Sequence, residues 1–290
     1  MKILLIGKTG QIGREIEKYA SDKHEIKAFS RKQLDVENYE KIEKIIDSFK
    51  PDCFINASGF HVISECERNP DQAFRINTYA VRKLAEMCTD RNIRLVNFSS
   101  DKVFDGRKRT PYVEKDVTNP IQIYGMSKLA GERAIHSYSN RAITIRTCGV
   151  YGGYSGSRIK KGNFVLMIIE QSKMKKFLEI SSEQIACFIN AEDLARTTVE
   201  LLEKNVEGGI YHVVNEGFGS WAQFAQKIVK LADIQMKIVP IDRSGVFSSI
   251  KIPIFAALGI KKIQSKGINM PSWEEGLSRY IKFLRSEKII

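Results

Sequence analysis

Apolar and polar positions in the first half of the chain alternate between two kinds of period. Short apolar runs predict β-strands at residues 2–7, 24–30, 52–58, 94–100 and 142–152. Between them, a helical pattern occupies residues 12–21, 38–49, 70–91 and 124–132. Strands that alternate with helices form a parallel sheet covered on both faces. The pattern therefore predicts an α/β fold with a Rossmann-type, doubly wound parallel sheet.

The alternation becomes irregular after about Gly152. Helices are predicted at 163–173 and 220–232, and short strands at 176–181, 209–214 and 236–241. No internal repeat or obvious linker separates the two parts, so we expect the second to pack on the first. The expected division is a Rossmann domain in residues 1–152, rejoined by about 186–215, and a smaller C-terminal α/β domain in 153–185 and 216–290.

Composition narrows the class of protein. The chain has 290 residues, 43% of them hydrophobic and 28% charged, which is ordinary for a soluble globular protein. No apolar run approaches the roughly 20 residues that span a bilayer, so no membrane association is expected. The opening "MKILLIG" is typical of a buried strand and lacks the cleavage site of a signal peptide.

The cysteines and the other ligand-type side chains indicate neither disulfides nor a metal. The five cysteines are odd in number, scattered, and never spaced as Cys-x-x-Cys. Reduced thiols of this kind are typical of the cytoplasm. No histidine or carboxylate cluster has metal-ligand spacing, so no metal is predicted.

The net charge of +12 comes from 46 basic and 34 acidic residues that are interleaved along the chain. Nucleic acid is one class of partner that a basic protein can bind. Interleaved charges are more typical of solvated helix faces than of a continuous basic surface. We therefore expect the excess charge to attract anionic small ligands and expect no nucleic acid.

A glycine-rich turn, "GKTGQIG", joins the first strand to the first helix and places Gly7, Gly10 and Gly13 at G-x-x-G-x-x-G spacing. Glycines there allow a tight turn and a close approach of the backbone to a pyrophosphate, and the helix N-terminus supplies free N–H groups. An ordinary turn could have the same glycines. The position after the first strand of an alternating fold favours dinucleotide binding.

The end of the second strand bears on which dinucleotide is bound. "SRKQLD" places Ser30, Arg31 and Lys32 there, and the first acid is Asp35. An acid directly after the strand favours NAD, whereas a cationic group suits the 2′-phosphate of NADP. NADPH is therefore the expected cofactor and NADH stays open, because Arg31 and Lys32 could also be surface decoration.

Tyr124 and Lys128 lie four residues apart in "YGMSKLAGE", on one helix face. Most such pairs are structural. Ser100, however, ends the fourth strand, at the edge of the sheet where ligands bind. A serine hydroxyl that binds a carbonyl oxygen, a tyrosine that donates a proton, and a lysine that lowers the tyrosine pKa form a complete set for carbonyl reduction.

The motifs "GKTGQIG", "FSSDKVFDG", "YGMSKLAGE" and "RTCGVYG" occur in this order, and the chain resembles the dTDP-4-dehydrorhamnose reductase family of extended short-chain dehydrogenase/reductases. The resemblance implies reduction of a 4-keto sugar on a nucleoside diphosphate, for surface polysaccharide biosynthesis. It implies catalytic roles for Ser100, Tyr124 and Lys128. The cofactor contacts that it implies, together with the turn and strand-end residues above, are Gly7, Thr9, Gly10, Gln11, Ile12, Gly13, Ser30, Arg31, Asp35, Asn56, Ala57 and Ser58.

Three substrate-side segments depart from that family's pattern. They contain Gly149 in place of a bulky aromatic residue, Cys187 and Phe188 in place of Pro-Thr, and Ile252, Pro253 and Ala256 in place of Arg-Pro-x-x-Ser. These changes predict a different sugar or slack selectivity. A bulkier sugar could fill the space at Gly149, or an aromatic residue such as Tyr154 or Phe188 could do so.

Two further residues are candidates for the substrate pocket. Asp101 follows Ser100 and either orients the substrate or caps the strand end. His61 lies after the third strand at the cofactor-facing end, and a surface role is its alternative.

Two other functions fit the same fold. One is a non-catalytic, dinucleotide-binding regulatory subunit, like the β subunit of methionine adenosyltransferase. The other is a sugar-nucleotide epimerase, which the missing acid after the second strand and the short C-terminal domain disfavour. The assembly state stays open, with a homodimer among the candidates.

Overall fold

The computed structural model describes residues 1–153, 162–242 and 250–290. Its centre is a six-stranded sheet in the order β10-β5-β4-β3-β1-β2. Every neighbouring pair in that sheet is parallel. The strands are β1 (Lys2–Ile6), β2 (Glu25–Phe29), β3 (Cys53–Asn56), β4 (Arg94–Ser100), β5 (Ile143–Thr147) and β10 (Gly209–His212). The expected Rossmann-type parallel sheet is confirmed, and the strand order reverses between β1 and β3, where ligands bind in such sheets.

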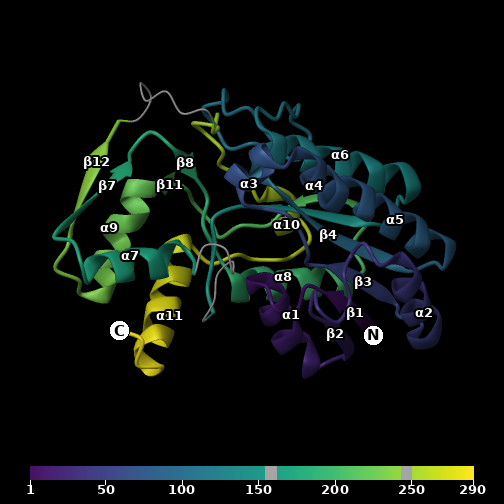
Figure 1. The fold of residues 1–290 in the computed structure, drawn as a ribbon. Helices are drawn as coiled ribbons and strands as arrows, with labels where there is room; N and C mark the ends of the chain where they lie inside the picture. Colours follow the sequence, from purple (N-terminus) through teal and green to yellow (C-terminus); the bar gives the residue numbers. More distant parts are fainter. Residues whose placement is uncertain (154–161, 243–249) are drawn as a thin grey trace.

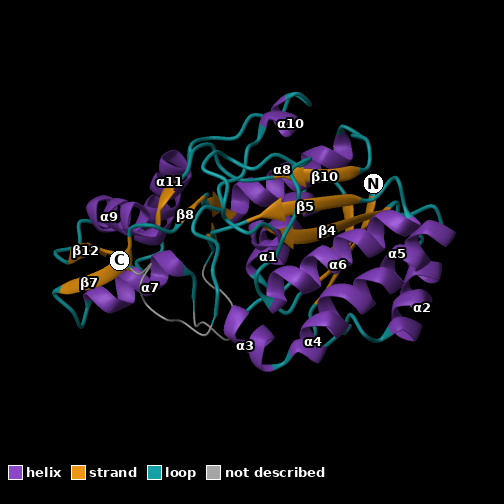
Figure 2. Ribbon diagram, turned by 90° about the horizontal axis from the view of Figure 1, so that it is seen from above, coloured by secondary structure: helices purple, strands orange, loops and turns teal. Residues whose placement is uncertain are grey.

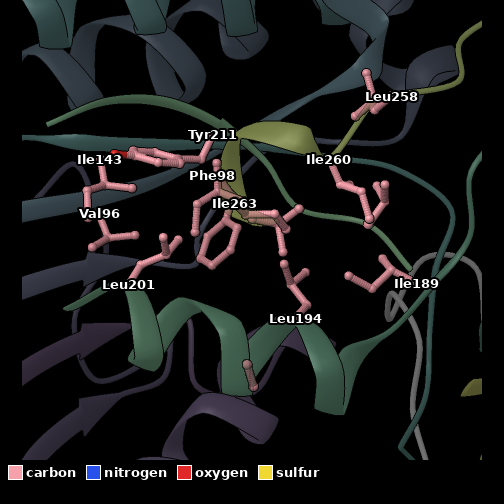
Figure 3. Close-up of a cluster of buried hydrophobic side chains, with 14 of the residues drawn as sticks. Val96, Phe98, Ile143, Ile189, Leu194, Leu201, Tyr211, Leu258, Ile260 and Ile263 are labelled. Atoms are coloured by element: carbon pink, nitrogen blue, oxygen red, sulfur yellow. The ribbon is translucent and has the colours of Figure 1, made fainter. Parts of the chain in front are cut away.

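Helices cover both faces of this sheet, because alternate residues of a buried strand point to opposite sides. Ile3 and Leu5 of β1 belong to the core on the side of α1 (Gln11–Ser21) and α8 (Ala191–Glu203). Figure 3 shows other members of this core, among them Leu194 and Leu201 of α8. Leu4 and Ile6 pack on the other side. The elements there are α2 (Tyr39–Phe49), α5 (Ala80–Asp90) and α6 (Ile123–Tyr138), which are labelled in Figure 2.

The helix expected over residues 70–91 is interrupted. It begins as α4 (Pro70–Phe74), just after α3 (Ile63–Arg68), passes through a π-helical turn, η1 (Arg75–Tyr79), and continues as α5. A π turn inside a helix frequently marks a functional site. No feature of the sequence indicates this turn, since its residues continue the helical pattern.

A second group of elements lies beside the sheet (Figure 1) and has a core of its own. It comprises α7 (Phe164–Ser172), α9 (Trp221–Ala232), α11 (Trp273–Ser286) and the parallel pair β7 (Phe177–Ser181) and β12 (Lys237–Ile241). Short pairs join the two parts: β6 (Val150–Tyr151) with β9 (Ile189–Asn190), and β8 (Ile185–Ala186) with β11 (Gly219–Ser220). A short α10 (Lys261–Gln264) packs near β10. We propose the domain division given above, because β10 and α8 return to the main sheet.

Within the described ranges, no helix has the length and apolar character needed to cross a membrane. The same residues contain no group of three histidine, cysteine or acidic side chains placed to hold a metal ion. All five cysteines are buried free thiols.

Candidate active site

The glycine turn is pressed against the end of β3. Gly7 has a φ of +87°, and a Cβ atom on it would lie 2.7 Å from the carbonyl carbon of Ala57. Gly13 faces the carbonyl of Gly7 so closely that a Cβ atom would overlap it. Only glycine fits both positions, so the turn keeps a shallow backbone cradle.

The cradle suits a dinucleotide phosphate. The α1 helix begins at Gln11, and its N-cap, Gly10, carries no side chain to occupy the N–H groups of the first turn. Thr9 lies in the turn itself, and Ile12 packs toward the core. The Gln11 side chain donates a hydrogen bond of 2.9 Å to the carbonyl of Gly152 and so connects the cradle with the start of the second part.

The end of β3 supports the cradle through its main chain. Asn56, which is 1% exposed, donates from Nδ2 to Oδ1 of Asn97 at 2.7 Å. Its own Oδ1 accepts from the backbone N–H of Ser58 at 3.1 Å. Asn56 therefore holds the bend at Ala57 and Ser58, and the backbone of those two residues lies next to Gly7.

The loop after β2 contains Arg31, Lys32 and Asp35, which bear on the choice between NADPH and NADH. Arg31 donates from Nε to Oδ2 of Asp35 at 3.0 Å, and Ser30 donates from Oγ to Gln33 at 2.9 Å. Arg31 and Lys32 are exposed. An exposed pair of this kind is worth at most about 1 kcal/mol, so Arg31 is free to exchange Asp35 for a phosphate.

Replacement of Arg31 and Lys32 by alanine is expected to weaken NADPH far more than NADH. Each charge-assisted hydrogen bond to the 2′-phosphate that is lost costs about 1.5–3 kcal/mol. The measurement is the dissociation constant of both cofactors by fluorescence titration. Lys44→Ala, an exposed cation that pairs with Glu40 on α2, is the control. An equal rise in the dissociation constants of NADPH and NADH would show that Arg31 and Lys32 do not bind the 2′-phosphate.

The structure brings Ser100, Tyr124 and Lys128 together at the carboxyl end of β4. Ser100 ends the strand, and its side chain lies near enough to that of Tyr124 on α6 to lower the pKa of the tyrosine against the rise that burial causes. One turn along α6, the ammonium of Lys128 lies 6.0 Å from the centre of the Tyr124 ring and donates to the carbonyl of Phe98 at 3.0 Å. The three predicted side chains therefore lie together, and their roles in proton transfer stay a prediction.

The electrostatics of the two titrating groups follow from their burial. Burial raises the pKa of Tyr124 above its usual value, and the hydrogen bond with Ser100 opposes that rise. Burial lowers the pKa of Lys128 to about 8, against the opposing charges of Cys66 and Glu132. Lys128 is thus largely charged at neutral pH, and Tyr124 holds its proton until a partner accepts it.

Asp101 and Lys102 extend this set. Ser100 donates from Oγ to Oδ1 of Asp101 at 2.9 Å, and Lys102 donates from Nζ to Oδ2 of Asp101 at 2.6 Å. Asp101 is 2% exposed. Its carboxylate is therefore placed to orient the Ser100 hydroxyl, a role that the sequence did not separate from substrate contact.

Two residues near Lys128 had escaped the sequence analysis. Asn77, in the π turn, donates from Nδ2 to the carbonyl of Phe60 at 2.7 Å and to Oγ of Ser127 at 3.0 Å. A Cβ atom on Gly59 would lie 3.2 Å from Nζ of Lys128. The π turn and a small residue after β3 thus leave room for the ammonium, and nothing in the sequence pattern singles out either one.

Two of the substrate-side departures, Gly149 and the Cys187–Phe188 pair, lie side by side in the structure. A Cβ atom on Gly149, whose φ is +50°, would lie 2.5 Å from the Cys187 carbonyl and 3.1 Å from the Phe188 ring. Phe188 is fully buried and stacks on Phe224 at 4.0 Å. The space beside Gly149 is therefore occupied by Phe188 from the neighbouring core, and Tyr154 lies outside the described residues.

The structure also places the candidate His61 and the departure at Ala256. His61 is exposed in the loop between β3 and α3. Ala256 is 1% exposed and donates its backbone N–H to the carbonyl of Ile185 at 2.9 Å, so it belongs to the framework of the second part.

Comparisons with known proteins agree with this geometry. The family described as RmlD substrate binding domain matches residues 1–286. A dTDP-4-dehydrorhamnose reductase of Aggregatibacter actinomycetemcomitans is 31% identical, over 95% of this chain and 97% of the relative. The spore coat polysaccharide biosynthesis protein SpsK of Bacillus subtilis is 29% identical, over 97% of each chain. The crystal structure of dTDP-4-dehydrorhamnose reductase from Bacillus anthracis in complex with NADP has a TM-score of 0.90 at 28% identity, covering 96% of this chain and 98% of that one.

Proposed function

We propose that this chain, which belongs to the dTDP-4-dehydrorhamnose reductase family matched by the RmlD description, reduces the 4-keto group of a nucleotide-activated deoxysugar with NADPH. The single observation that carries the proposal is the meeting of Ser100, Tyr124 and Lys128 beside the glycine cradle. The chain is an oxidoreductase of a sugar-nucleotide family, as its relatives are. The 4-keto deoxysugar as substrate and the preference for NADPH over NADH are both part of this proposal.

The cradle fits the cofactor because Gly7 and Gly13 leave backbone, and no side chain, at the start of α1. When bound, the nicotinamide supplies the hydride that reduces the carbonyl carbon. Arg31 would hold the 2′-phosphate, and the first turn of α1 would hold the pyrophosphate.

The residues of the chain manage the proton. Ser100 would bind the carbonyl oxygen and Tyr124 would donate its proton to that oxygen as negative charge develops. Lys128, charged below a pKa of about 8, stabilises the phenolate that remains. Ser100 donates its one proton to Asp101 in the structure, so its O–H would turn from that carboxylate to the carbonyl oxygen when the substrate binds.

We infer the biological setting from the same resemblance. Surface polysaccharide biosynthesis in the cytoplasm is the proposed setting, supported by the likeness to SpsK. The +12 charge would then serve two diphosphate ligands. A homodimer remains a proposal for the assembly state.

The test of the function is NADPH oxidation with a panel of 4-keto sugar nucleotides, followed by identification of the products. Oxidation with at least one member and reduction at carbon 4 is the expected result. A regulatory subunit would bind NADPH without turnover on any member, and that outcome would overturn the proposal.

The same panel tests the substrate-side departures. Gly149 carries no ring, Ala256 carries no hydroxyl, and Phe188 beside Gly149 is apolar and fully buried, so none of the three offers a polar group that could reject an isosteric sugar. We expect a substrate other than dTDP-4-dehydrorhamnose, or slack selectivity that includes it, measured as kcat/KM across the panel. A preference for dTDP-4-dehydrorhamnose of about a hundredfold or more, roughly 2.7 kcal/mol, would show that Phe188 has compensated for Gly149.

A further inference from the structure

One buried carboxylate of the "YGMSKLAGE" segment has no part in the reaction described so far. Lys128, Glu132 and His136 are spaced four residues apart, so they form a polar stripe along one face of α6. All three contact the sheet. Lys128 donates to the carbonyl of Phe98, and His136 lies 3.1 Å from the Thr144 hydroxyl. Glu132 contacts side chains of β4 and β5. A core-facing helix normally buries apolar residues there, so the stripe calls for an explanation.

Glu132 binds two strands at once. Its carboxylate accepts a hydrogen bond from Oγ of Ser99 on β4. It also accepts from Nε and Nη2 of Arg146 on β5, at 2.9 and 2.7 Å. Glu132 is 1% and Arg146 2% exposed, so the pair is fully desolvated.

The two strands held in this way are those that end at the active site. Ser99 is opposite Arg146 in the register, and Ser100 is opposite Thr147 one step further. Glu132 is also one helical turn from Lys128, and its charge favours the charged form of that lysine. A single carboxylate therefore contacts the residue before Ser100 and lies next to the ammonium in the same helix.

Stability alone does not explain this pair. A buried ion pair is often matched or exceeded by apolar residues of similar volume. The guanidinium also remains incompletely satisfied, since its Nη1 has no hydrogen-bond partner in the described structure. A costly arrangement at this place is better explained by what it positions.

We propose that Glu132, through Arg146 and Ser99, is a positioning residue that fixes the end of β4 and so holds Ser100 in register with Tyr124 and Lys128. The inference rests on the proposed function for its kinetic consequence. Its structural consequence, the environment of Lys128, can be read without turnover.

The experiment compares three variants of the full chain. Glu132→Met with Arg146→Met removes both charges and leaves an apolar pair, which avoids stranding one buried charge. Glu132→Gln removes only the carboxylate charge. Thr144→Val removes, from a fully buried position on β5, the hydroxyl that meets His136, the stripe residue one helical turn beyond Glu132.

We expect the double variant to fold with a Tm near that of the wild type, to bind NADPH normally, and to lose about 10- to 100-fold in kcat, because misplacement at the reacting centre has costs of this size. KM for the sugar should change little. Thr144→Val should keep kcat within about twofold. Wild-type kcat in the double variant, or an equal loss in Thr144→Val, would overturn the inference.

The readout that does not need turnover is the titration of Lys128 by NMR in lysine-labelled protein, with Lys128→Met for assignment. The groups that face its ammonium are Cys66 of α3, Asn77 of η1, the Phe98 carbonyl of β4, and Tyr124 and Glu132 of α6. Glu132→Gln should move the titration midpoint, and the alkaline limb of the pH–rate profile, to lower pH. An unmoved midpoint would overturn the inference, whereas an inactive wild type with a moved midpoint would count against the proposed function alone.

Discussion

Tyr124→Phe is expected to lower kcat by roughly two to four orders of magnitude, the range that a positioned proton donor contributes. The ring is kept, so its packing on α6 is unchanged and only the hydroxyl that meets Ser100 is lost. NADPH affinity should stay close to that of the wild type. The measurement is single-turnover NADPH oxidation at saturating sugar nucleotide.

Tyr138→Phe provides a matched control on the same helix. Tyr138 is the last residue of α6, and its hydroxyl accepts a hydrogen bond of 2.6 Å from Arg82 of α5. Its loss should leave kcat within about twofold of the wild type, as expected of a surface contact. If Tyr124→Phe behaved like Tyr138→Phe, Tyr124 would not be the proton donor.

Gly13→Ala is expected to damage the cofactor site and the fold together. A Cβ atom there meets the Gly7 carbonyl and lies 2.9 Å from Cα of Lys8, and both are backbone atoms that cannot rotate away. Overpacking of this kind costs about 1–3 kcal/mol in the free energy of unfolding. Displacement of the turn should also weaken NADPH by about tenfold or more, because the pyrophosphate depends on backbone approach.

Chemical denaturation measures the free energy of unfolding, and NADPH titration measures the dissociation constant of the cofactor. Gly259→Ala is the comparison, because a Cβ atom on Gly259 would come no closer than 3.4 Å to its neighbours. We expect that variant to keep its stability within about 0.5 kcal/mol and to bind NADPH normally. A Gly13→Ala protein with unchanged cofactor affinity would contradict the assignment of the cradle.

The main parallel sheet, and the residues at the carboxyl ends of its strands, could be predicted from the sequence. Residues 2–7 and 94–100 are apolar runs that end at the glycine turn and at Ser100, and the two strands run parallel in one sheet with only β3 between them. Period and turn chemistry determine such elements locally, so a pattern reveals them. Tyr124 and Lys128 could be paired because a helix puts positions four apart on one face.

What escaped prediction depends on contacts between distant segments. The π turn at 75–79 continues a helical pattern, and only its packing against α6, where Asn77 meets Ser127, shows its purpose. The sequence left open whether a bulkier sugar, Tyr154 or Phe188 fills the space at Gly149, because the answer depends on the path of a segment about forty residues later. The engagement of Asp101 with both Ser100 and Lys102 is likewise a matter of side-chain direction, which spacing does not specify.

The central claim is that this chain transfers a hydride to carbon 4 of a sugar nucleotide while Tyr124 supplies the proton. The most direct measurement uses NADPH that carries deuterium at the transferred position of the nicotinamide, with the sugar product analysed by mass spectrometry and NMR. We predict one deuterium at carbon 4 for each NADPH oxidised, and loss of that product in Tyr124→Phe. Product without the label, or sugar conversion without net NADPH oxidation, as an epimerase would give, would contradict the claim.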